Sequence, residues 1–480
     1  MPPRKCVSMG NAGAFPVPLP GGSPVADLYA GVTTDGAYNL TYFGPSRTNS
    51  PWVRLFVEWN FLWPKAPTQL ASGTDPKKSR YRSPPPDQAL LDNLDRNIQL
   101  ARSVGLKIIL TTIGFPSWAN RSVIPAGTPA NKDEFVFPPD SVLVPATSTP
   151  PNGSAFQPSD FMYSLWVHEL MFRYHPAAPH TAGISIDALE VVNEPNVQAV
   201  QNTKSTNYRS TALMMMTAQR VKSSLNKRHK GKQPIRLLGP ATADTPGAWR
   251  RFTMSLISAL KAPITFGKQT YHFDATDHAF GWSHHNYNDV EQIANMFAAL
   301  PAAVRQGILQ LQHPEAYFAL FYGTRTQQIR TLLRGTGTTS WWNGWGQQAA
   351  PRLWLTEGGC RLEKITGYPG VDPTTTYSST GVPNDPVPGF KQLQSWALAG
   401  AAHALSQTAP GQAGRGIEMF TNFLFYDEPP FSSAGSLIGN FSGLLDHYVT
   451  NASGQPTETA AQEARIALFA WALFGTDTPR

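Results

Sequence analysis

The sequence is poor in the residues that build cross-links, metal clusters and membrane spans. Its 480 residues include two cysteines, Cys6 and Cys360, and no Cys-x-x-Cys pair. We therefore expect neither a disulfide framework nor a cysteine-based metal or redox centre. No apolar run reaches the ~18 residues of a transmembrane helix, and residues 1–22 lack the apolar stretch of a signal peptide. The compartment is left open.

Charged residues are also scarce, at 15% of the chain, whereas hydrophobic residues make up 41%. This balance argues against a disordered chain and supplies a large core. The net charge of +7 comes from scattered basic residues with short runs at 77–78 and 227–230. Such scatter is typical of a solvated surface rather than of a nucleic-acid site. The 43 prolines and 39 glycines follow no collagen-like period, so they indicate many ordered loops.

Short apolar runs alternate with helical patterns along most of the chain. We expect strands near 28–34 and over 52–60, 107–118, 188–196, 234–242, 279–289, 352–359 and 416–427. We expect helices over 87–105, 158–176, 206–228, 247–261, 325–335, 389–407 and 459–475. Strands that alternate with helices indicate parallel βαβ units. Eight of them in a chain of this length favour an α/β fold, the (β/α)8 TIM barrel with long βα loops.

The chain shows no repeat of fixed period and no linker, so the sequence predicts a single barrel domain over residues 26–478. Residues 1–25, which include Cys6, are expected to be a loosely ordered Pro/Gly-rich lead-in. The stretches 60–87, 119–157 and 288–325 are expected to be long irregular loops that determine specificity.

Two of the expected strands end on a glutamate. Residues 190–196 read EVVNEPN, with Glu194 after the apolar run, and residues 352–359 read RLWLTEGG, with Glu357 before two glycines. In a barrel of this kind the carboxyl ends of the strands meet at one rim, where active sites lie. We therefore expect Glu194 and Glu357 to face each other, although 163 residues separate them (357 − 194).

Paired carboxylates at a cleft suit glycoside hydrolysis. One carboxyl group must be protonated, so that it can give its proton to the leaving oxygen, and the other must be ionised, so that it can attack the anomeric carbon. An amide beside the acid, here Asn193, can bind the sugar 2-hydroxyl, a contact that strengthens in the transition state. Pro195 is expected to hold Glu194 in extended backbone and so fix the direction of its side chain.

The motif VVNEPN followed by LWLTEGG resembles the glycoside hydrolases of clan A, retaining enzymes on a (β/α)8 barrel. In that clan an Asn-Glu pair ends strand 4 and supplies the acid/base, and a glutamate that ends strand 7 is the nucleophile. The resemblance implies that Glu194 is the acid/base and Glu357 the nucleophile, and it extends over residues 25–475. The stretch GLLDHYVTNASGQPTETAAQ (443–462) is similar to the segment before the final helix in families such as 5 and 39. This similarity assigns the chain to neither of these two families.

The same resemblance gives roles to residues at other strand ends. Arg54 lies in the second strand, where the clan often carries an arginine beside the nucleophile, and a cation there would hold Glu357 ionised. His285 and Tyr287, in SHHNYND, match a His-x-Tyr pattern that the clan often has after strand 6. Tyr287 is expected to donate to the nucleophile, His285 to bind substrate, and one of His284 and His285 to pack. No metal and no cofactor is expected, because no further ligand lies at ligand spacing and the hydrolysis needs none.

Aromatic residues near the rim are candidates for stacking on sugar rings. Trp118 ends the third strand and Trp59 follows the second. Glu58, which precedes Trp59, has two interpretations: it binds a sugar hydroxyl, or it pairs with Arg54 or another cation.

Two other aromatic stretches carry less weight. Phe425 and Tyr426 end the eighth strand, where many clan members have a tryptophan, and this departure leaves the floor of the −1 sugar subsite open. The tryptophan-rich stretch 340–345 precedes the seventh strand, so we expect it to pack on the opposite face of the barrel.

The favoured interpretation is a retaining β-glycoside hydrolase acting on a carbohydrate, with its two carboxyl groups about 5–5.5 Å apart. A transglycosylase with the same two glutamates stays open. So does a non-catalytic carbohydrate-binding barrel, although the presence of both glutamates argues against it. A metal-dependent barrel hydrolase would need His-x-His after the first strand, and GVTTDGAYN (31–39) has none. No nucleic-acid or membrane partner is expected; the sugar, the linkage, exo or endo action and the oligomeric state are left open.

Overall fold

A computed structural model describes most of the expected strands and helices. The described residues are 4–8, 52–64, 68–69, 81–82, 86–103, 105–116, 162–176, 183–197, 207–228, 235–244, 248–266, 269–275, 277, 279–334, 352–361, 364–367, 388–408, 411, 413–423, 431–433 and 436–438. Trp118, Phe425, Tyr426, the stretch 340–345 and the helix expected over 459–475 lie outside them.

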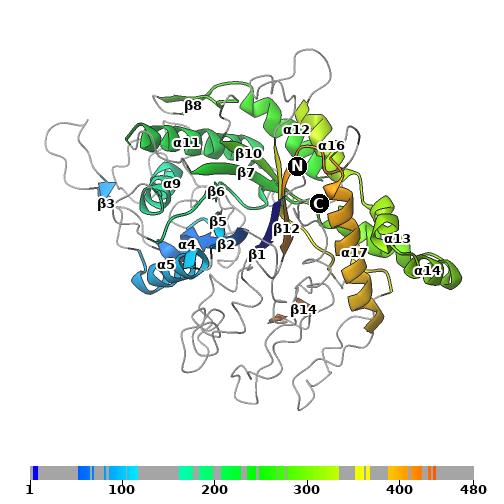
Figure 1. The fold of residues 1–480 in the computed structure, drawn as a ribbon. Helices are drawn as coiled ribbons and strands as arrows, with labels where there is room; N and C mark the ends of the chain where they lie inside the picture. Colours follow the sequence, from blue (N-terminus) through cyan, green and yellow to red (C-terminus); the bar gives the residue numbers. More distant parts are fainter. Residues whose placement is uncertain are drawn as a thin grey trace.

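Eight parallel strands form a closed barrel in the described part of the chain (Figure 1). They are β1 (Arg4–Ser8), β2 (Trp52–Glu58), β5 (Lys107–Ile113), β6 (Ala188–Glu190), β7 (Arg236–Thr242), β10 (Phe280–His285), β11 (Leu353–Glu357) and β12 (Ile417–Phe423). Each strand pairs with the next in chain order, and β1 closes the ring by pairing with both β12 and β2. The positions predicted for the second to eighth strands are confirmed.

The prediction for the first strand was wrong. The strand that closes the barrel is β1, inside the segment that the sequence suggested to be a lead-in, and the expected strand near 28–34 lies outside the described residues. Arg4–Ser8 pairs residue by residue with Met419–Phe423. Its basic start reads as a polar terminus, but Cys6 is completely buried, because a free cysteine packs like a small apolar residue.

One layer of apolar side chains fills the interior of the barrel. Seven of the eight strands each contribute one residue to it: Cys6, Trp52, Ile109, Ala188, Leu238, Trp354 and Met419. The remaining strand, β10, places Gly281 in this layer, and a Cβ at this position would lie 2.7 Å from Cδ1 of Trp354. The indole of Trp354 thus occupies the space that a side chain on β10 would need, and the interior is a packed core rather than a pore.

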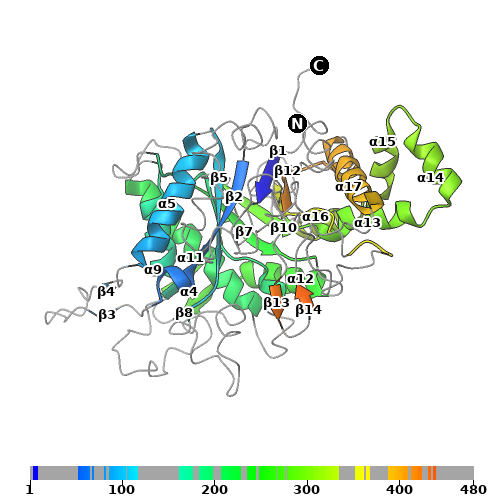
Figure 2. The ribbon, with the colours of Figure 1, turned by 90° about the horizontal axis from the view of Figure 1, so that it is seen from below.

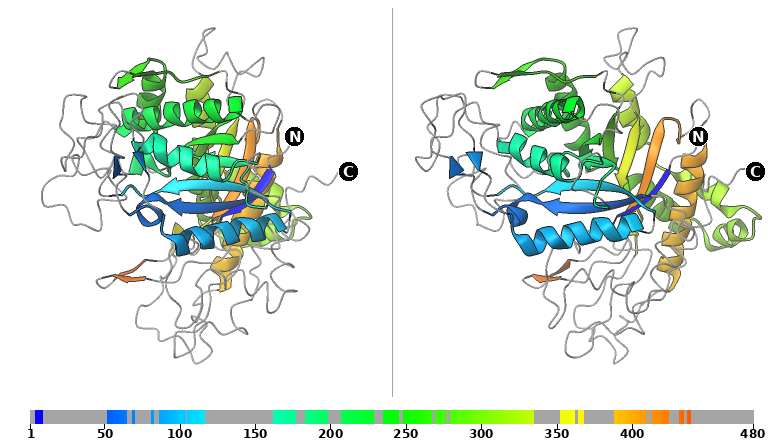
Figure 3. Two further views of the ribbon diagram at one scale, coloured as in Figure 1. Left: turned by 90° about the vertical axis from the view of Figure 1, so that its left-hand side faces the viewer. Right: turned by 60° about the vertical axis from the view of Figure 1, so that its left-hand side comes forward.

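Helices surround the barrel in the described part of the chain. They are α4 (Trp59–Leu62), α5 (Gln88–Ser103), α9 (Met162–Arg173), α11 (Asn207–Arg228), α12 (Ala248–Leu260) and α17 (Pro388–Ser406), besides those after β10. Figure 3 shows α5, α9 and α11 along one side of the barrel. Their apolar faces meet the outward side chains of the strands in one large core. The described helices follow six of the eight strands, so eight complete βα units stay a prediction.

Helices also occupy the stretch 288–325, where the sequence suggested both a long irregular loop and a long helical insertion that ends at 325–335. They are α13 (Tyr287–Ala298), α14 (Ala302–Leu309), α15 (Pro314–Phe318), the 3₁₀ helix η4 (Ala319–Phe321) and α16 (Arg325–Arg334). Figure 2 shows α14 and α15 projecting beside α17. Asp289 accepts hydrogen bonds from the backbone N–H groups of Arg325 and Thr326, so it caps α16.

Three two-stranded antiparallel sheets complete the described elements. They are β3 (Thr68–Gln69) with β4 (Tyr81–Arg82), β8 (Ile264–Phe266) with β9 (Gln269–Tyr271), and β13 (Phe431–Ser433) with β14 (Ser436–Ile438). Among the described helices, none combines the length and apolar character that crossing a membrane requires.

The close contact at Gly281 makes a stability prediction. Gly281→Ala would place its Cβ 2.7 Å from the Trp354 ring and 2.9 Å from Leu238 Cδ2, and overpacking of this kind costs about 1–3 kcal/mol. Gly307→Ala is the matched control, because Gly307 lies in α14 with open space around it and gains about 0.5–1 kcal/mol of helix propensity. Urea unfolding checks both; a Gly281→Ala variant as stable as the parent would contradict the packing.

Candidate active site

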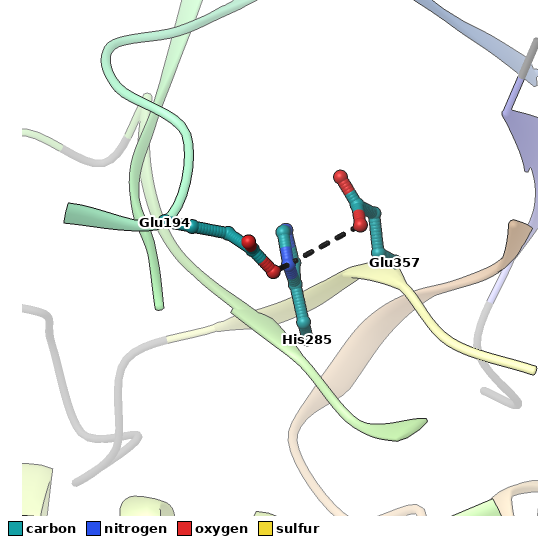
Figure 4. A group of neighbouring side chains, drawn as sticks. All are labelled: Glu194, His285 and Glu357. Carbon is teal, nitrogen blue, oxygen red and sulfur yellow. Dashed lines mark hydrogen bonds and ion pairs between the residues drawn. The ribbon is translucent and has the colours of Figure 1, made fainter. Parts of the chain in front are cut away.

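Four barrel strands bring the main candidate residues together. Arg54 comes from β2, Glu194 from the turn after β6, His285 from the end of β10 and Glu357 from the end of β11. One carboxylate oxygen of Glu194, one of Glu357 and a ring nitrogen of His285 all lie within 4.8 Å of one another. Figure 4 shows both carboxylates directed at the imidazole. The structure thus places together the two glutamates that the sequence singled out.

An irregularity in the sheet aims Glu357 into the barrel. Side chains alternate between the two faces of a strand, so Trp354 and Thr356 would share the inner face and Glu357 the outer one. The pairing of β10 with β11 shifts by one residue here, because His284 pairs with Leu355 but His285 pairs with Glu357. A shift of this kind redirects a side chain and is common beside active sites.

Three groups contact the Glu357 carboxylate, which is 5% exposed. Arg54 Nη1 donates to Oε1. The hydroxyl of Tyr287 donates to Oε2 over 3.1 Å, and His285 Nδ1 lies 3.4 Å from the same oxygen. Burial and the charge of Glu357 raise the pKa of Tyr287 well above its ordinary value, so the phenol keeps its proton and stays a donor.

Arg54 connects this carboxylate to a second buried acid, Glu190. The guanidinium is completely buried, and its Nε and Nη2 donate to Oε2 of Glu190 over 2.9 and 2.6 Å. Nη2 also donates to Oδ1 of Asn193 over 2.9 Å. Burial by itself lowers the pKa of Arg54, but the charges of Glu190 and Glu357 outweigh it and raise the pKa. Burial raises the pKa of Glu190, and Arg54 and His285 more than offset this, so the pKa is lowered.

The contact with Arg54 orients the amide of Asn193. Its oxygen accepts from the guanidinium, so the amide nitrogen is left as the donor at the half-buried rim. A donor there suits a sugar hydroxyl, which is the role that the sequence suggested for Asn193.

The turn that carries Glu194 departs from the expectation for a residue before proline. Extended backbone was expected, but Glu194 has a φ of 44°, in the left-handed region that side chains other than glycine rarely adopt. Two contacts with the end of β7 hold the turn. The backbone N–H of Glu194 donates to the carbonyl of Ala241 over 3.0 Å, and Asn196 exchanges two hydrogen bonds with the backbone of Ala243. Tertiary contacts thus override the preference set by Pro195.

Glu194 and His285 form a proton-sharing pair. The Glu194 side chain is 32% exposed, and its Oε1 lies 2.8 Å from Nδ1 of the completely buried His285. Burial raises the pKa of Glu194. The hydrogen bond and the charge of His285 more than offset this effect, so the pKa is lowered overall. Burial lowers the pKa of His285, and Glu357 and Glu194 outweigh this and raise it. The pair therefore holds one proton, which the two opposite shifts place on His285 beside an ionised Glu194.

The neighbouring His284 faces the other side of β10. Its Nδ1 lies 3.0 Å from the hydroxyl of Thr242, and the ring is completely buried beside Trp249. Burial and the charge of His285 lower the pKa of His284 well below its ordinary value, so this imidazole is neutral and structural. Alternation along the strand separates the two histidines.

Trp59, proposed from the sequence as a sugar-binding residue, lies in the core instead. Its ring stacks on Trp166 of α9, with 5.5 Å between centroids, and contacts Tyr163 and Phe115 at its edges. The side chain is 3% exposed. Val53, Leu55 and Val57 of β2 pack in the core between the barrel and its helices, and Trp59, the first residue of α4, joins them there.

The guanidinium of Arg54 bonds Glu190, Glu357 and Asn193. Glu58 is 3% exposed and lines a small cavity with Leu62, Leu90 and Leu94. Both interpretations of Glu58, a sugar contact and a pair with a cation, stay predictions. The proposed sugar contact of Trp118 lies outside the described residues.

Sequence reasoning missed two residues of the site, Glu190 and Arg361. Glu190 had a signal: it is a charged residue inside the apolar run ALEVV, and buried parallel strands seldom carry an unpaired charge. Arg361 had none. Its guanidinium carbon lies 4.4 Å from the centre of the Tyr287 ring, and its Nε donates to Glu291 of α13. It therefore holds Tyr287 from above and adds a positive charge near Glu194, whose pKa it lowers.

A cation would compete with contacts that the site already makes. Among the described residues, Glu194, His285 and Glu357 are the group whose donor atoms could hold a metal ion. Those atoms already contact one another, Arg54 and Tyr287. A metal ion would have to displace these contacts and lie close to the guanidinium. The arrangement fits proton transfer and nucleophilic attack better than metal binding.

Comparisons with known proteins return distant structural matches. No protein-family model and no curated protein matches the sequence. A family 39 glycoside hydrolase from the gut symbiont Bacteroides cellulosilyticus WH2 aligns at 12% identity and a TM-score of 0.43, over 99% of this chain and 64% of that one. An exo-β-1,4-mannosidase from Opitutaceae bacterium strain TAV5 aligns at 12% identity and a TM-score of 0.43, over 99% of this chain and 59% of that one. An endo-β-1,4-glucanase from Xanthomonas axonopodis pv. citri aligns at 12% identity and a TM-score of 0.40, over 98% of both chains.

This chain thus spans less than two thirds of the length of the first two of these proteins. At these TM-scores the likeness adds nothing to the account of the site, whose geometry stands on its own.

Removal of the buried cation should destabilise the protein strongly. Arg54→Met leaves Glu190 and Glu357 buried without the guanidinium that bonds both, and loss of one partner from a buried ion pair costs about 3–5 kcal/mol. The contribution of Glu190 to the free energy of unfolding depends on pH in a defined direction. Its pKa is lowered in the folded protein, so it stabilises the fold above its unfolded pKa, and this contribution is lost as the pH falls through the folded value. The deficit of Arg54→Met should therefore be largest at neutral pH and shrink in acid.

Arg236→Met serves as the control for this substitution. Arg236 pairs with Glu418 but is 32% exposed, and pairs of that kind contribute about 0–1 kcal/mol. Chemical denaturation from pH 4 to 8 compares the two variants. Equal losses in both, or a deficit in Arg54→Met that does not vary with pH, would contradict the account of the buried cation.

Proposed function

We propose that the chain is a retaining glycoside hydrolase that cleaves a β-linked glycoside through a covalent glycosyl-enzyme. Glu194 is the general acid and base, and Glu357 is the nucleophile. The observation that carries the proposal is the pair of carboxylates, with oxygens within 4.8 Å of each other, in two different electrostatic settings. The proposal includes a complete (β/α)8 barrel of the clan A type in a single domain.

The separation of the two carboxylates supports a double displacement. Carboxyl groups about 5–5.5 Å apart let one of them attack the anomeric carbon directly, whereas an inverting enzyme needs about 6.5–9.5 Å to admit a water molecule. An oxygen-to-oxygen distance of at most 4.8 Å between Glu194 and Glu357 falls in the shorter class.

The setting of Glu357 favours the nucleophile. A nucleophilic carboxylate must be ionised when the substrate arrives, and a cation within hydrogen-bond distance favours that form. Arg54 provides the cation, and Tyr287 provides a neutral donor to the other oxygen. Both donors also fix the carboxylate in one orientation before the reaction begins.

The setting of Glu194 favours the acid and base. Its side chain is the more exposed of the two carboxylates, at 32% against 6% for Glu357, so it can reach a leaving group that extends into solvent. In the first step the proton held by the pair of Glu194 and His285 moves to the glycosidic oxygen. The bond from this oxygen to the anomeric carbon breaks as Glu357 bonds to that carbon. In the second step Glu194 takes a proton from water, whose oxygen displaces Glu357 and releases the sugar.

The substrate is a carbohydrate with a hydroxyl group that the Asn193 amide can reach. The amide nitrogen of Asn193 is turned to the rim by the bond between its oxygen and Arg54. A hydrogen bond from this nitrogen to the 2-hydroxyl would strengthen as charge develops at the neighbouring anomeric carbon.

The proposal is tested first by activity on aryl β-glycosides with glucosyl, xylosyl, galactosyl, mannosyl, fucosyl and arabinosyl groups. The wild-type enzyme should turn over at least one of them with retention of anomeric configuration, followed by NMR. Glu357→Ala should be inactive. Glu194→Ala should lose roughly 10²–10⁴-fold in activity and regain turnover with azide, giving a β-glycosyl azide. Glu169→Ala, on the surface of α9, is the control and should match wild type.

Three outcomes would contradict the proposal. Inversion of configuration would exclude the double displacement. Wild-type activity in Glu357→Ala and Glu194→Ala would place the chemistry on other residues. If the enzyme cleaves none of the aryl glycosides and no β-linked oligosaccharide, the proposed hydrolase activity is excluded.

The shared proton predicts a shift in the pH profile. The general acid loses its proton as the pH rises, which sets the basic limb of kcat/KM. The raised pKa of His285 keeps the proton in the pair to higher pH than a carboxyl group alone would. His285→Gln should therefore move the basic limb to lower pH. His168→Gln, on the surface of α9, should leave the limb in place, and an unmoved limb in His285→Gln would contradict the shared proton.

A further inference from the structure

We propose that Glu190 is a positioning residue for the nucleophile, acting through Arg54, which it orients and whose charge it balances throughout the reaction. This inference rests on the glycoside hydrolase function proposed above. Glu190 itself lies below the carboxylates that would meet the sugar, at the end of β6 and completely buried.

The contacts of Glu190 fix the plane of the guanidinium. Its Oε2 accepts from both Nε and Nη2 of Arg54, at 2.9 and 2.6 Å. The hydroxyl of Thr111, on β5, donates to the same oxygen over 2.8 Å and holds it in place. Two bonds from one edge of a guanidinium to one oxygen leave the planar group no freedom to rotate.

This orientation directs the other edge of Arg54 to the reacting groups. With Nε and Nη2 on Glu190, Nη1 is left for Glu357 and the second N–H of Nη2 for Asn193. One planar group thereby sets the position of the nucleophile relative to the amide proposed to bind the sugar. The ring of Phe56 lies 4.4 Å from the guanidinium carbon and supports it from the side.

The charge of Glu190 becomes more important as the reaction proceeds. Before the reaction, two carboxylates share the one positive charge of Arg54. In the glycosyl-enzyme, Glu357 is an ester and carries no charge. Glu190 is then the acid that still bonds Arg54, and a buried cation without a partner would be costly. Glu190 therefore lets Glu357 give up its charge without stranding Arg54.

Other charged groups also face this pair, and all of them affect the pH profile. They are Glu194 with its neighbour His285, Tyr287, which donates to Glu357, and Arg361, which lies over the ring of Tyr287. Loss of the charge of Glu190 removes an attraction that keeps the proton on His285. The basic limb of the kcat/KM profile should therefore move to lower pH.

The first experiment compares Glu190→Gln with wild type on the best aryl glycoside. The amide keeps the shape and an oxygen acceptor for Arg54 but removes the charge. We expect kcat to fall roughly 10²-fold, as for a misplaced reacting group, KM to change little, and the basic limb to move to lower pH. Glu418→Gln is the matched control, since Glu418 bonds Arg236 and Trp354 from β12, and its basic limb should stay in place.

Glu190→Asp separates charge from position. It keeps the charge but shortens the side chain, so its pH limbs should match wild type while kcat falls. If Glu190→Gln does not fold, this variant carries the test, and wild-type kcat in Glu190→Asp would overturn the proposal. Wild-type kcat and an unmoved basic limb in Glu190→Gln would overturn it too. A lower kcat with an unmoved basic limb would show a structural role alone and would also overturn it.

A second experiment does not depend on activity. The unfolding free energies of wild type, Glu190→Gln, Glu357→Gln and the double variant form a double-mutant cycle. Each single variant leaves Arg54 one carboxylate, and the double variant leaves it neither. The double variant should lose more stability than the two singles combined, and additive losses would overturn the coupling. Coupling without any glycosidase activity would mean that the proposed function fails while the connection through Arg54 stands.

Discussion

The guanidinium of Arg54 is the interaction on which the site depends. It is a completely buried cation that bonds Glu190 from β6, Asn193 from the turn after β6 and Glu357 from β11. A buried charge tolerates few arrangements, because each unsatisfied donor would cost free energy. The requirement to satisfy Arg54 therefore fixes the relative positions of strands that are far apart in the sequence. The carboxylate of Glu357, the proposed nucleophile, is held in place by the same bonds that satisfy the buried cation.

The division of labour between the two glutamates follows from what surrounds each. Glu357 is buried, and its carboxylate accepts hydrogen bonds from the guanidinium of Arg54 and the hydroxyl of Tyr287, a setting that suits the proposed nucleophile. Glu194 lies on a turn at the rim and contacts an imidazole, which can both give and take a proton. The unusual backbone of Glu194, with a φ of 44°, is held by Ala241 and Asn196. The strain is thus supported by the neighbouring strand β7.

Hydrophobic patterning predicted seven strand positions and the pairing of Glu194 with Glu357, because the ends of parallel strands must meet at one edge. It failed where tertiary contacts decide. The strand around Cys6 looks polar in sequence, and its burial is set by the ring closure of the barrel. Trp59 was assigned to the rim, although alternation from Arg54 puts it on the outer side. Glu190 was overlooked because a charge in an apolar run has meaning only once a buried partner is known.

The layer below the site explains why its counter-charges must come from the barrel itself. Trp52, Ile109 and Ala188 belong to the apolar layer, and two residues further along the same strands stand Arg54, Thr111 and Glu190. The interior thus changes from hydrocarbon to charge within one step of the pleat. Arg54 is completely buried above this packed layer, and its charge is balanced by Glu190 and Glu357. In the proposed reaction Glu357 has to give up its charge, whereas Glu190 keeps its own. The permanent charge of Glu190 therefore supports the role proposed for Glu357 as the nucleophile.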